Sequence, residues 1–300
     1  MSMSDVGDSS IPAMTSPVAV HKRGVAFFID AGAVCPMKDR PKDWYLRWWT
    51  QNYKLWEGRT FVIFDTFLDA RHSYVDVGAW IGPTVLYAAA KARHVYCLEP
   101  DPEAYRVLSL NLSVNPQYRN ITALNSALSD SDGYRTLTAA GELGRSESTM
   151  LPRGAADRHI VVRVPGITVE TLVREYSVTD CSLVKIDIEG GELIVVPAIA
   201  SFLRNQRPAL YLSIHWGALA VEEVESIIDL LLSIYDFVYD DSLRRTLDKR
   251  RIVSERISSI VCTSRPITAR QRLAAWRMVF FQRLGGFLHS ALRPGHVRRV

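Results

Sequence analysis

A buried strand that runs through a glycine turn into a helix is the feature that most restricts how this chain can fold. Tyr74 to Val77 is β-branched, aromatic and apolar enough for a buried strand, interrupted by a single aspartate. Gly78 and Gly82 then break the pattern, and Pro83 stands where the first residue of a helix is expected. Residues 84–92, rich in Ala and Leu, have the composition of a helix. This order opens nucleotide-binding α/β folds, in which the ligand lies at the carboxyl end of the strand.

An acidic residue at the end of the next apolar run narrows the choice of ligand. Glu99 lies about 20 residues after Gly78, a spacing at which such folds place a carboxylate on ribose hydroxyls. The turn reads D-x-G-x-x-x-G rather than G-x-G-x-x-G, and it frames no helix N-terminus for a pyrophosphate. This favours S-adenosylmethionine, which has a ribose but no phosphate, over NAD. The alternatives are a tight turn without a ligand, and Glu99 as a surface acid.

Four short motifs follow one another in an order known from one family. They are DVGAWIGPT at 76–84, LEPDP at 98–102, NSALSDSDG at 125–133 and VKIDIEGGE at 184–192. With these motifs the chain resembles the FkbM family of S-adenosylmethionine-dependent methyltransferases, over roughly residues 56–215. The resemblance implies an α/β fold of the Rossmann-like, class I methyltransferase type: a doubly wound, mostly parallel sheet with helices on both faces.

The alternation of strand and helix patterns predicts the same doubly wound sheet. Further strands are expected at 121–128, 182–188, 209–214, 237–240 and 257–262, and helices at 60–68, 168–176, 192–204 and 221–234. Residues 133–137 are expected to pair with 159–164, across a polar loop that is a candidate substrate lid. The chain divides into a disordered leader (1–20), an N-terminal helical and aromatic extension (21–70), the methyltransferase domain (71–265) and a basic amphipathic C-terminal helix and tail (266–300).

The candidate cofactor residues gather at the ends of the expected strands. Asp76 is expected to fix the glycine turn or to meet the methionine ammonium. Trp80 stands where many members of the family have Asn, and we expect it to cover the cofactor or to pack beneath the helix. The resemblance implies that the end of segment 125–127 lies beside the adenine. The full candidate set is Asp76, Gly78, Ala79, Trp80, Gly82, Glu99, Asn125, Ser126, Ala127 and Asp187.

The candidate catalytic residues follow the fourth and fifth core strands. Strand alternation places Lys185, Asp187 and Glu189 on one side, and three charges there would be costly without partners or function. Pairing of Lys185 with a carboxylate is the structural explanation. Asp187 and Glu189 are candidates to hold the acceptor or to take its proton. His215 is either a structural residue or a general base. No metal is predicted, because no complete ligand set is visible.

Two segments outside this core have two interpretations each. The aromatic residues of 41–56 are expected to pack on the core, with a wall over the ligand as the alternative. No acidic residue follows Glu255, and the arginines of 266–300 flank a helical apolar stripe of Leu273, Trp276, Phe280, Leu284 and Phe287. This stripe is expected to dock on the domain or to contact an anionic membrane surface. No recognition motif accompanies the arginines, so no nucleic-acid partner is expected.

These patterns predict an S-adenosylmethionine-dependent O-methyltransferase. The resemblance implies an acceptor hydroxyl on a sugar, a glycan or a secondary metabolite. The alternatives are a catalytically silent scaffold or peripheral membrane partner with this fold, and an NAD(P)-dependent oxidoreductase. The widely spaced cysteines and the lack of a signal sequence or a run of about 20 apolar residues predict a cytoplasmic protein, with the inner face of the membrane as a further location.

Overall fold

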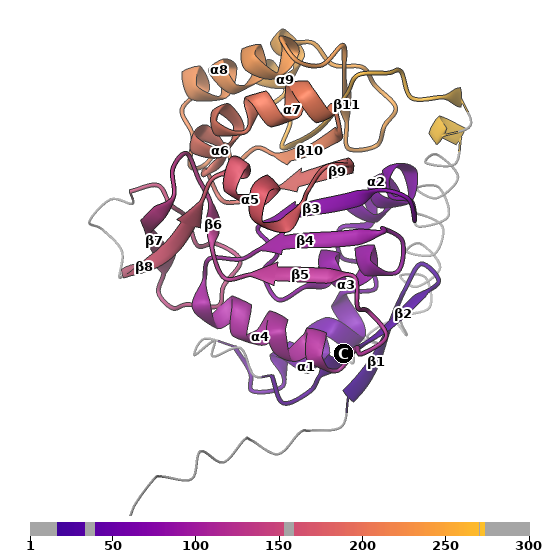
Figure 1. Ribbon diagram of the computed structural model, residues 1–300, viewed down its shortest axis with the longest axis vertical. Coiled ribbons are helices and arrows are strands. Elements are labelled where there is room, and N and C mark those ends of the chain that lie inside the picture. The colour runs from indigo at the N-terminus through magenta and orange to yellow at the C-terminus, as the bar shows by residue number, and fades with distance from the viewer. Residues whose placement is uncertain (1–16, 34–39, 153–158, 270, 274–300) are drawn as a thin grey trace, which may run out of the picture.

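The computed structural model of the chain describes residues 17–33, 40–152, 159–269 and 271–273 (Figure 1). Its centre is a seven-stranded sheet in the order β11-β12-β10-β9-β3-β4-β5. Neighbouring strands from β10 to β5 are parallel, and β12 is antiparallel to both β10 and β11. The strands are β3 (Ser73–Val77), β4 (His94–Leu98), β5 (Ile121–Leu124), β9 (Cys181–Ile186), β10 (Ala209–Ser213), β11 (Phe237–Asp240) and β12 (Ser259–Thr263). This confirms the predicted doubly wound, mostly parallel sheet.

Helices cover both faces of the sheet and make two separate apolar layers. Alternation along β3 sends Tyr74 into one layer and Val75 into the other. The first layer contains side chains from α2 (Gly58–Phe67), α3 (Pro83–Ala89) and α4 (Pro102–Ser113). The second contains side chains from α5 (Val169–Tyr176), α6 (Glu192–Ala198), α7 (Ala200–Gln206), α8 (Val221–Leu232) and α9 (Lys249–Ser254). Because the chain order reverses at β3, a ligand is expected at the carboxyl ends of β3, β4 and β9.

An N-terminal hairpin and an aromatic helical segment pack beside α3 and α4. The hairpin consists of β1 (Pro17–Lys22) and β2 (Val25–Asp30), and the segment of α1 (Trp44–Arg47) and a π-helix, η1 (Trp48–Asn52). Lys22 joins the two, because its Nζ donates to the carbonyl oxygens of Tyr53 at 2.7 Å and Trp56 at 2.6 Å. The prediction of a disordered leader is therefore wrong for residues 17–20, which begin a strand. The rest of the predicted leader lies outside the described residues.

A second, three-stranded sheet stands beside the carboxyl ends of the central strands (Figure 1). It is formed by β6 (Ala127–Leu128), β8 (His159–Ile167) and β7 (Gly133–Ala140). The predicted strand over 121–128 is wrong as a single element, because the chain leaves the central sheet after Leu124 and β6 pairs with β8. The predicted pairing of 133–137 with 159–164 is confirmed in kind, since β7 and β8 are antiparallel partners.

One predicted helix is divided in the structure, and another lies mostly outside the described residues. The helix expected over 192–204 divides at Ile199 into α6 and α7, just after Pro197, whose ring is incompatible with an unbroken hydrogen-bond ladder. The predicted C-terminal helix falls mostly outside the described residues, which end at Leu273. Within the described part of the chain, no helix combines the length and apolar character needed to cross a membrane.

Candidate active site

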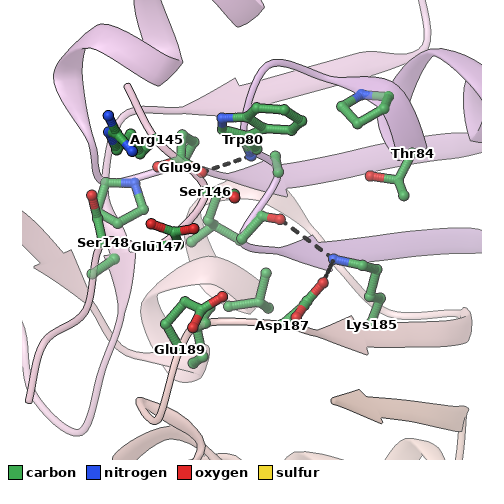
Figure 2. Close-up of a pocket in the computed structure, with 18 of the residues that line it drawn as sticks. Trp80, Thr84, Glu99, Arg145, Ser146, Glu147, Ser148, Lys185, Asp187 and Glu189 are labelled. Carbon is green, nitrogen blue, oxygen red and sulfur yellow. Dashed lines mark hydrogen bonds and ion pairs between the residues drawn. The ribbon is translucent and has the colours of Figure 1, made fainter. Parts of the chain in front are cut away.

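A cavity of about 390 Å³ lies over the carboxyl ends of the central strands (Figure 2). It is lined by the β3–α3 turn, by the ends of β4 and β9, by the loop at 145–148 and by the N-terminal aromatic segment. Of the candidate site residues, those that line it are Gly78, Ala79, Trp80, Glu99, Ser126, Ala127, Asp187, Glu189 and His215. Asp76, Gly82 and Asn125 are not among the lining residues.

The glycines of the β3–α3 turn make room for protein atoms. Gly78 has φ +88°, and a Cβ there would lie 2.1 Å from the backbone oxygen of Asp187. Gly82 has φ +95°, and its Cβ would lie 2.7 Å from the side chain of Leu108 on α4. Both residues therefore need glycine for backbone conformation and packing. The backbone approach expected at Gly82 is taken by Leu108, whereas Gly78 and Ala79 still border the cavity.

Glu99 is buried at the end of β4, with its carboxylate fixed by main-chain donors. One oxygen accepts from Trp80 N at 2.7 Å (Figure 2), and the other accepts from Asp101 N at 2.9 Å. Burial raises the pKa of Glu99 to about 8, although these two hydrogen bonds act in the opposite direction. Each carboxylate oxygen keeps a lone pair after one hydrogen bond. The group therefore suits a ligand that brings a pair of hydroxyl donors.

Of the three candidate residues at the turn from β5 to β6, one supports the end of β4 and two line the cavity. The Asn125 side chain donates to the backbone oxygens of Glu99 at 2.8 Å and Pro100 at 3.3 Å, so it supports the end of β4. Ser126 and Ala127 line the cavity beside Glu99. Segment 125–127 therefore offers the cavity a hydroxyl and a small apolar surface.

Lys185 on β9 is buried, lines the cavity and lies between two carboxylates. Lys185 Nζ lies 3.4 Å from an oxygen of Asp76 and 3.3 Å from an oxygen of Asp187. Asp76 is fully buried and also accepts from Thr84 Oγ1 at 2.6 Å. Burial alone would lower the pKa of Lys185, but the two carboxylates raise it well above its usual range. Asp76 does not line the cavity, and its oxygens are engaged by Lys185 and Thr84.

His215 lies among three carboxylates at the end of β10. Its Nδ1 is 2.8 Å from Glu192, and its Nε2 is 3.4 Å from oxygens of both Asp187 and Glu189. Burial lowers the pKa of His215, but hydrogen bonds to Glu189 and Glu192 outweigh it and raise the pKa to about 10. Both ring nitrogens face carboxylates, an arrangement that favours the protonated imidazole, which has no lone pair for a proton. Burial also raises the pKa of Asp187, but Lys185 and His215 together hold it below its usual range.

A loop between β7 and β8 covers one side of the cavity and is held by Asp101. Gly144 N and Ser148 Oγ both donate to one oxygen of Asp101 at 2.9 Å, while its other oxygen caps α4. Trp80 Nε1 donates to Gly144 O at 2.9 Å. Residues 145–148 line the cavity, as expected of the polar loop. Asp101 is not among the predicted site residues, because its contact with the loop joins segments more than 40 residues apart.

The aromatic segment combines the two interpretations offered by the sequence. Tyr45, Trp49 and Tyr53 are buried in the core, whereas Trp44, Trp48 and Trp56 line the cavity. The Trp48 ring centroid lies 6.4 Å from Trp44, 5.4 Å from Trp56 and 5.1 Å from Trp80. The lining tryptophans therefore form one continuous surface.

Sequence reasoning also missed Glu57, which lines the cavity next to Trp56. The residue is exposed, but partial loss of solvation at its carboxyl group raises its pKa, and the nearby Asp187 carboxylate adds to that effect. Among the described residues, no group of three or more His, Cys, Asp or Glu side chains has an arrangement that could hold a metal ion.

The sequence match extends over the strands that build this site. A model of the methyltransferase FkbM domain matches residues 76–240. The chain belongs to the FkbM methyltransferase family. Membership confirms S-adenosylmethionine as the predicted cofactor, and the fixed, buried carboxylate of Glu99 fits its ribose. The aromatic segment and Glu57 lie before the matched region.

Individual relatives are more distant. The methyltransferase sdnD of Sordaria araneosa is 31% identical over 154 residues, which cover 42% of this chain and 59% of the relative. The chain thus spans about six-tenths of the length of that protein. An FkbM methyltransferase from Methylobacillus flagellatus is 16% identical, with a TM-score of 0.41, and the likeness covers 65% of this chain and 44% of that one. An rRNA methylase from Streptococcus thermophilus is 10% identical, with a TM-score of 0.39. The likeness covers 69% of this chain and 94% of that one.

Proposed function

We propose that the protein transfers a methyl group from S-adenosylmethionine to a hydroxyl oxygen of an uncharged sugar, glycan or secondary metabolite. The observation that carries the proposal is a cavity lined by two chemically different sets of residues, which we assign to its two ends. At one end, Glu99 is fixed by two backbone N–H groups beside Ser126 and Ala127. At the other end, tryptophans face a network of ion-paired carboxylates.

The first end provides the proposed nucleoside site. Glu99 would accept hydrogen bonds from the ribose hydroxyls, and Gly78, Ala79 and Trp80 would border the cofactor along the turn. Ser126 and Ala127 would face the adenine. When bound, the cofactor supplies a methyl group on a positively charged sulfur, which is neutral after transfer. The protein's main tasks are therefore to place the acceptor oxygen in line and to provide for its proton.

The second end provides the proposed acceptor site. Lys185 and His215 are already paired with carboxylates, which favours an uncharged acceptor over an anionic one. Asp187 and Glu189 would accept hydrogen bonds from acceptor hydroxyls, and His215 would hold these two carboxylates in place. The apolar indole surfaces of Trp44 and Trp56 would cover an apolar face of the acceptor and displace water from it.

Calorimetric titration with S-adenosylhomocysteine and, separately, with NAD tests the nucleoside site. We expect heat of binding for the first ligand only, because the glycine turn lacks the phosphate-binding spacing. Binding of NAD in preference to S-adenosylhomocysteine would overturn the proposal and favour an oxidoreductase. Transfer of radiolabelled methyl to hydroxyl compounds separates the enzyme from a catalytically silent scaffold, which would bind the cofactor without turnover.

A further inference from the structure

Glu57 is a carboxylate of the acceptor end that comes from outside the matched family domain. We propose that Glu57 is the general base that accepts the proton of the acceptor hydroxyl, and that the N-terminal extension thereby contributes a catalytic residue. The inference rests on the proposed methyl transfer to oxygen. It assigns the proton-accepting role that His215 and Asp187 are poorly placed to fill.

The backbone at Glu57 is held in a conformation that few side chains adopt. The residue has φ +42° and ψ +47°, in the left-handed region, just before α2 begins. Such a conformation costs on the order of 1–3 kcal/mol for a residue other than glycine and persists only where its surroundings impose it. Here the preceding carbonyl, that of Trp56, accepts from the buried Lys22 Nζ at 2.6 Å. The strain therefore fixes where the carboxylate enters the cavity.

Hydrogen bonds connect Glu57 to β10, the strand that precedes His215. One carboxylate oxygen of Glu57 accepts from Thr60 Oγ1 at 3.0 Å. Thr60 Oγ1 is in turn 2.9 Å from the hydroxyl of Tyr211 on β10. These contacts place Glu57 beside β10, on the side that we propose for the acceptor. One oxygen is thus held in position, and the group still borders the cavity.

The charges around Glu57 give it the ionisation behaviour of a base. Glu57 is an exposed residue, but the protein around its carboxyl group displaces solvent and raises its pKa above 4.5; repulsion from Asp187 and Asp76 adds to this, while Lys185 and the Thr60 hydrogen bond lower it. A general base works best when its pKa approaches the working pH. Asp187, whose pKa is lowered, is the weaker base, and Lys185 and His215 are cations near neutral pH.

The proposed step balances with these groups alone. The acceptor oxygen forms a bond to the methyl carbon while the carbon–sulfur bond breaks and its electron pair stays on sulfur. The hydroxyl proton passes to the Glu57 carboxylate, which becomes a neutral carboxylic acid and later releases the proton to water. Trp48 and Trp56 border the same space, and their surfaces limit the access of water to the reacting hydroxyl.

Glu103 provides a control, because it is a glutamate in the first turn of α4 that does not line the cavity. The experiment measures single-turnover transfer of labelled methyl from S-adenosylmethionine to p-nitrophenyl pyranosides as a function of pH. We expect Glu57→Gln to slow transfer roughly 100- to 10,000-fold and to remove the rise of the rate with pH. Affinity for S-adenosylhomocysteine should stay within about twofold in both variants, and Glu103→Gln should lose less than about fivefold in rate. A Glu57→Gln rate within threefold of the wild type, with the same pH profile, would overturn the assignment.

Failure of the proposed function gives a different pattern. If the wild type binds S-adenosylhomocysteine but labels none of these pyranosides, the proposed acceptor class falls. The role of Glu57 is then judged by its carboxyl titration, followed by ¹³C NMR with S-adenosylhomocysteine bound and assigned with Glu57→Gln. A midpoint above 4.5 supports a poised base, and a midpoint at or below 4.5 overturns it.

Discussion

Replacement of Glu99 by Gln tests the nucleoside site most directly, because it changes charge with little change in shape. The carboxylate now accepts from two main-chain N–H groups, those of Trp80 and Asp101. An amide has one acceptor oxygen, so it can satisfy only one of them and places its NH₂ against the other. We therefore expect Glu99→Gln to disturb the end of β4 locally as well as to remove the charge.

The expected loss of affinity follows from the proposed ribose contacts. A hydrogen bond to a charged group contributes about 1.5–3 kcal/mol, compared with about 0.5–1.5 kcal/mol for a neutral one. Two ribose hydroxyls would lose about 2–3 kcal/mol together, which corresponds to roughly 30- to 140-fold weaker binding of S-adenosylhomocysteine. Glu103→Gln, which changes a nearby acid that does not line the cavity, should bind like the wild type.

The same carboxylate predicts how affinity changes with pH. Because the pKa of Glu99 is raised to about 8, the group must lose a proton before hydroxyl donors can bind its charged form below that pH. Calorimetric affinity of the wild type should therefore rise between pH 6 and 8, and Glu99→Gln should not show this rise. Circular dichroism and thermal unfolding check that the variants fold. A dissociation constant for Glu99→Gln within threefold of the wild type would refute the assignment of Glu99 to the ribose.

Three further predictions concern the turn, the histidine and the loop. Gly78→Ala should lower the free energy of unfolding by about 3 kcal/mol or more in urea titrations, because its Cβ would meet the backbone of Asp187. The His215 imidazole should titrate near pH 10 by NMR, and Glu192→Gln should lower that midpoint. Since the folded pKa exceeds the unfolded value of 6.5, this network stabilises the fold below pH 6.5 and loses its contribution as the pH approaches 10. Asp101→Asn keeps the acceptor that caps α4 but not the one that holds the loop, so amide exchange over 141–151 should accelerate while that of α4 does not.

The sequence predicted the central sheet well because its signals are local. Strands β3, β4, β9 and β10 are short apolar runs bounded by glycine, proline or polar residues, and the helices between them carry clear apolar faces. The apolar pattern of the sequence failed to predict strands where it continues across a change of pairing partner. Residues 121–128 read as one strand, yet they divide between two sheets. The short, charged helix α9 has too little periodicity to be seen in the sequence.

The sequence predicted which residues line the candidate site better than it predicted their ionisation and long-range contacts. Residues in the strand-end motifs, such as Glu99, Asp187 and His215, do come together around one cavity. The ionisation of His215 could not be predicted, because it depends on Glu192 and Glu189, which reach the imidazole only in the folded chain. Glu57 was missed for the same reason: nothing in its neighbourhood in the sequence connects it with β10, from which it is more than 150 residues distant.

The buried lysine of the N-terminal hairpin has a consequence for attempts to isolate or exchange the catalytic domain. Lys22 anchors the carbonyls that precede Glu57, so a hairpin of residues 17–30 sets the shape of a wall far from it in the sequence. A fragment trimmed to residues 76–240 would retain Glu99 and the ends of β4 and β9, but would lack the tryptophan surface and β12. A chimera that swaps the N-terminal segment up to residue 60 between homologues should thus change the tryptophan wall of the proposed acceptor site, while Asp187, Glu189 and the methyl-donor site stay the same.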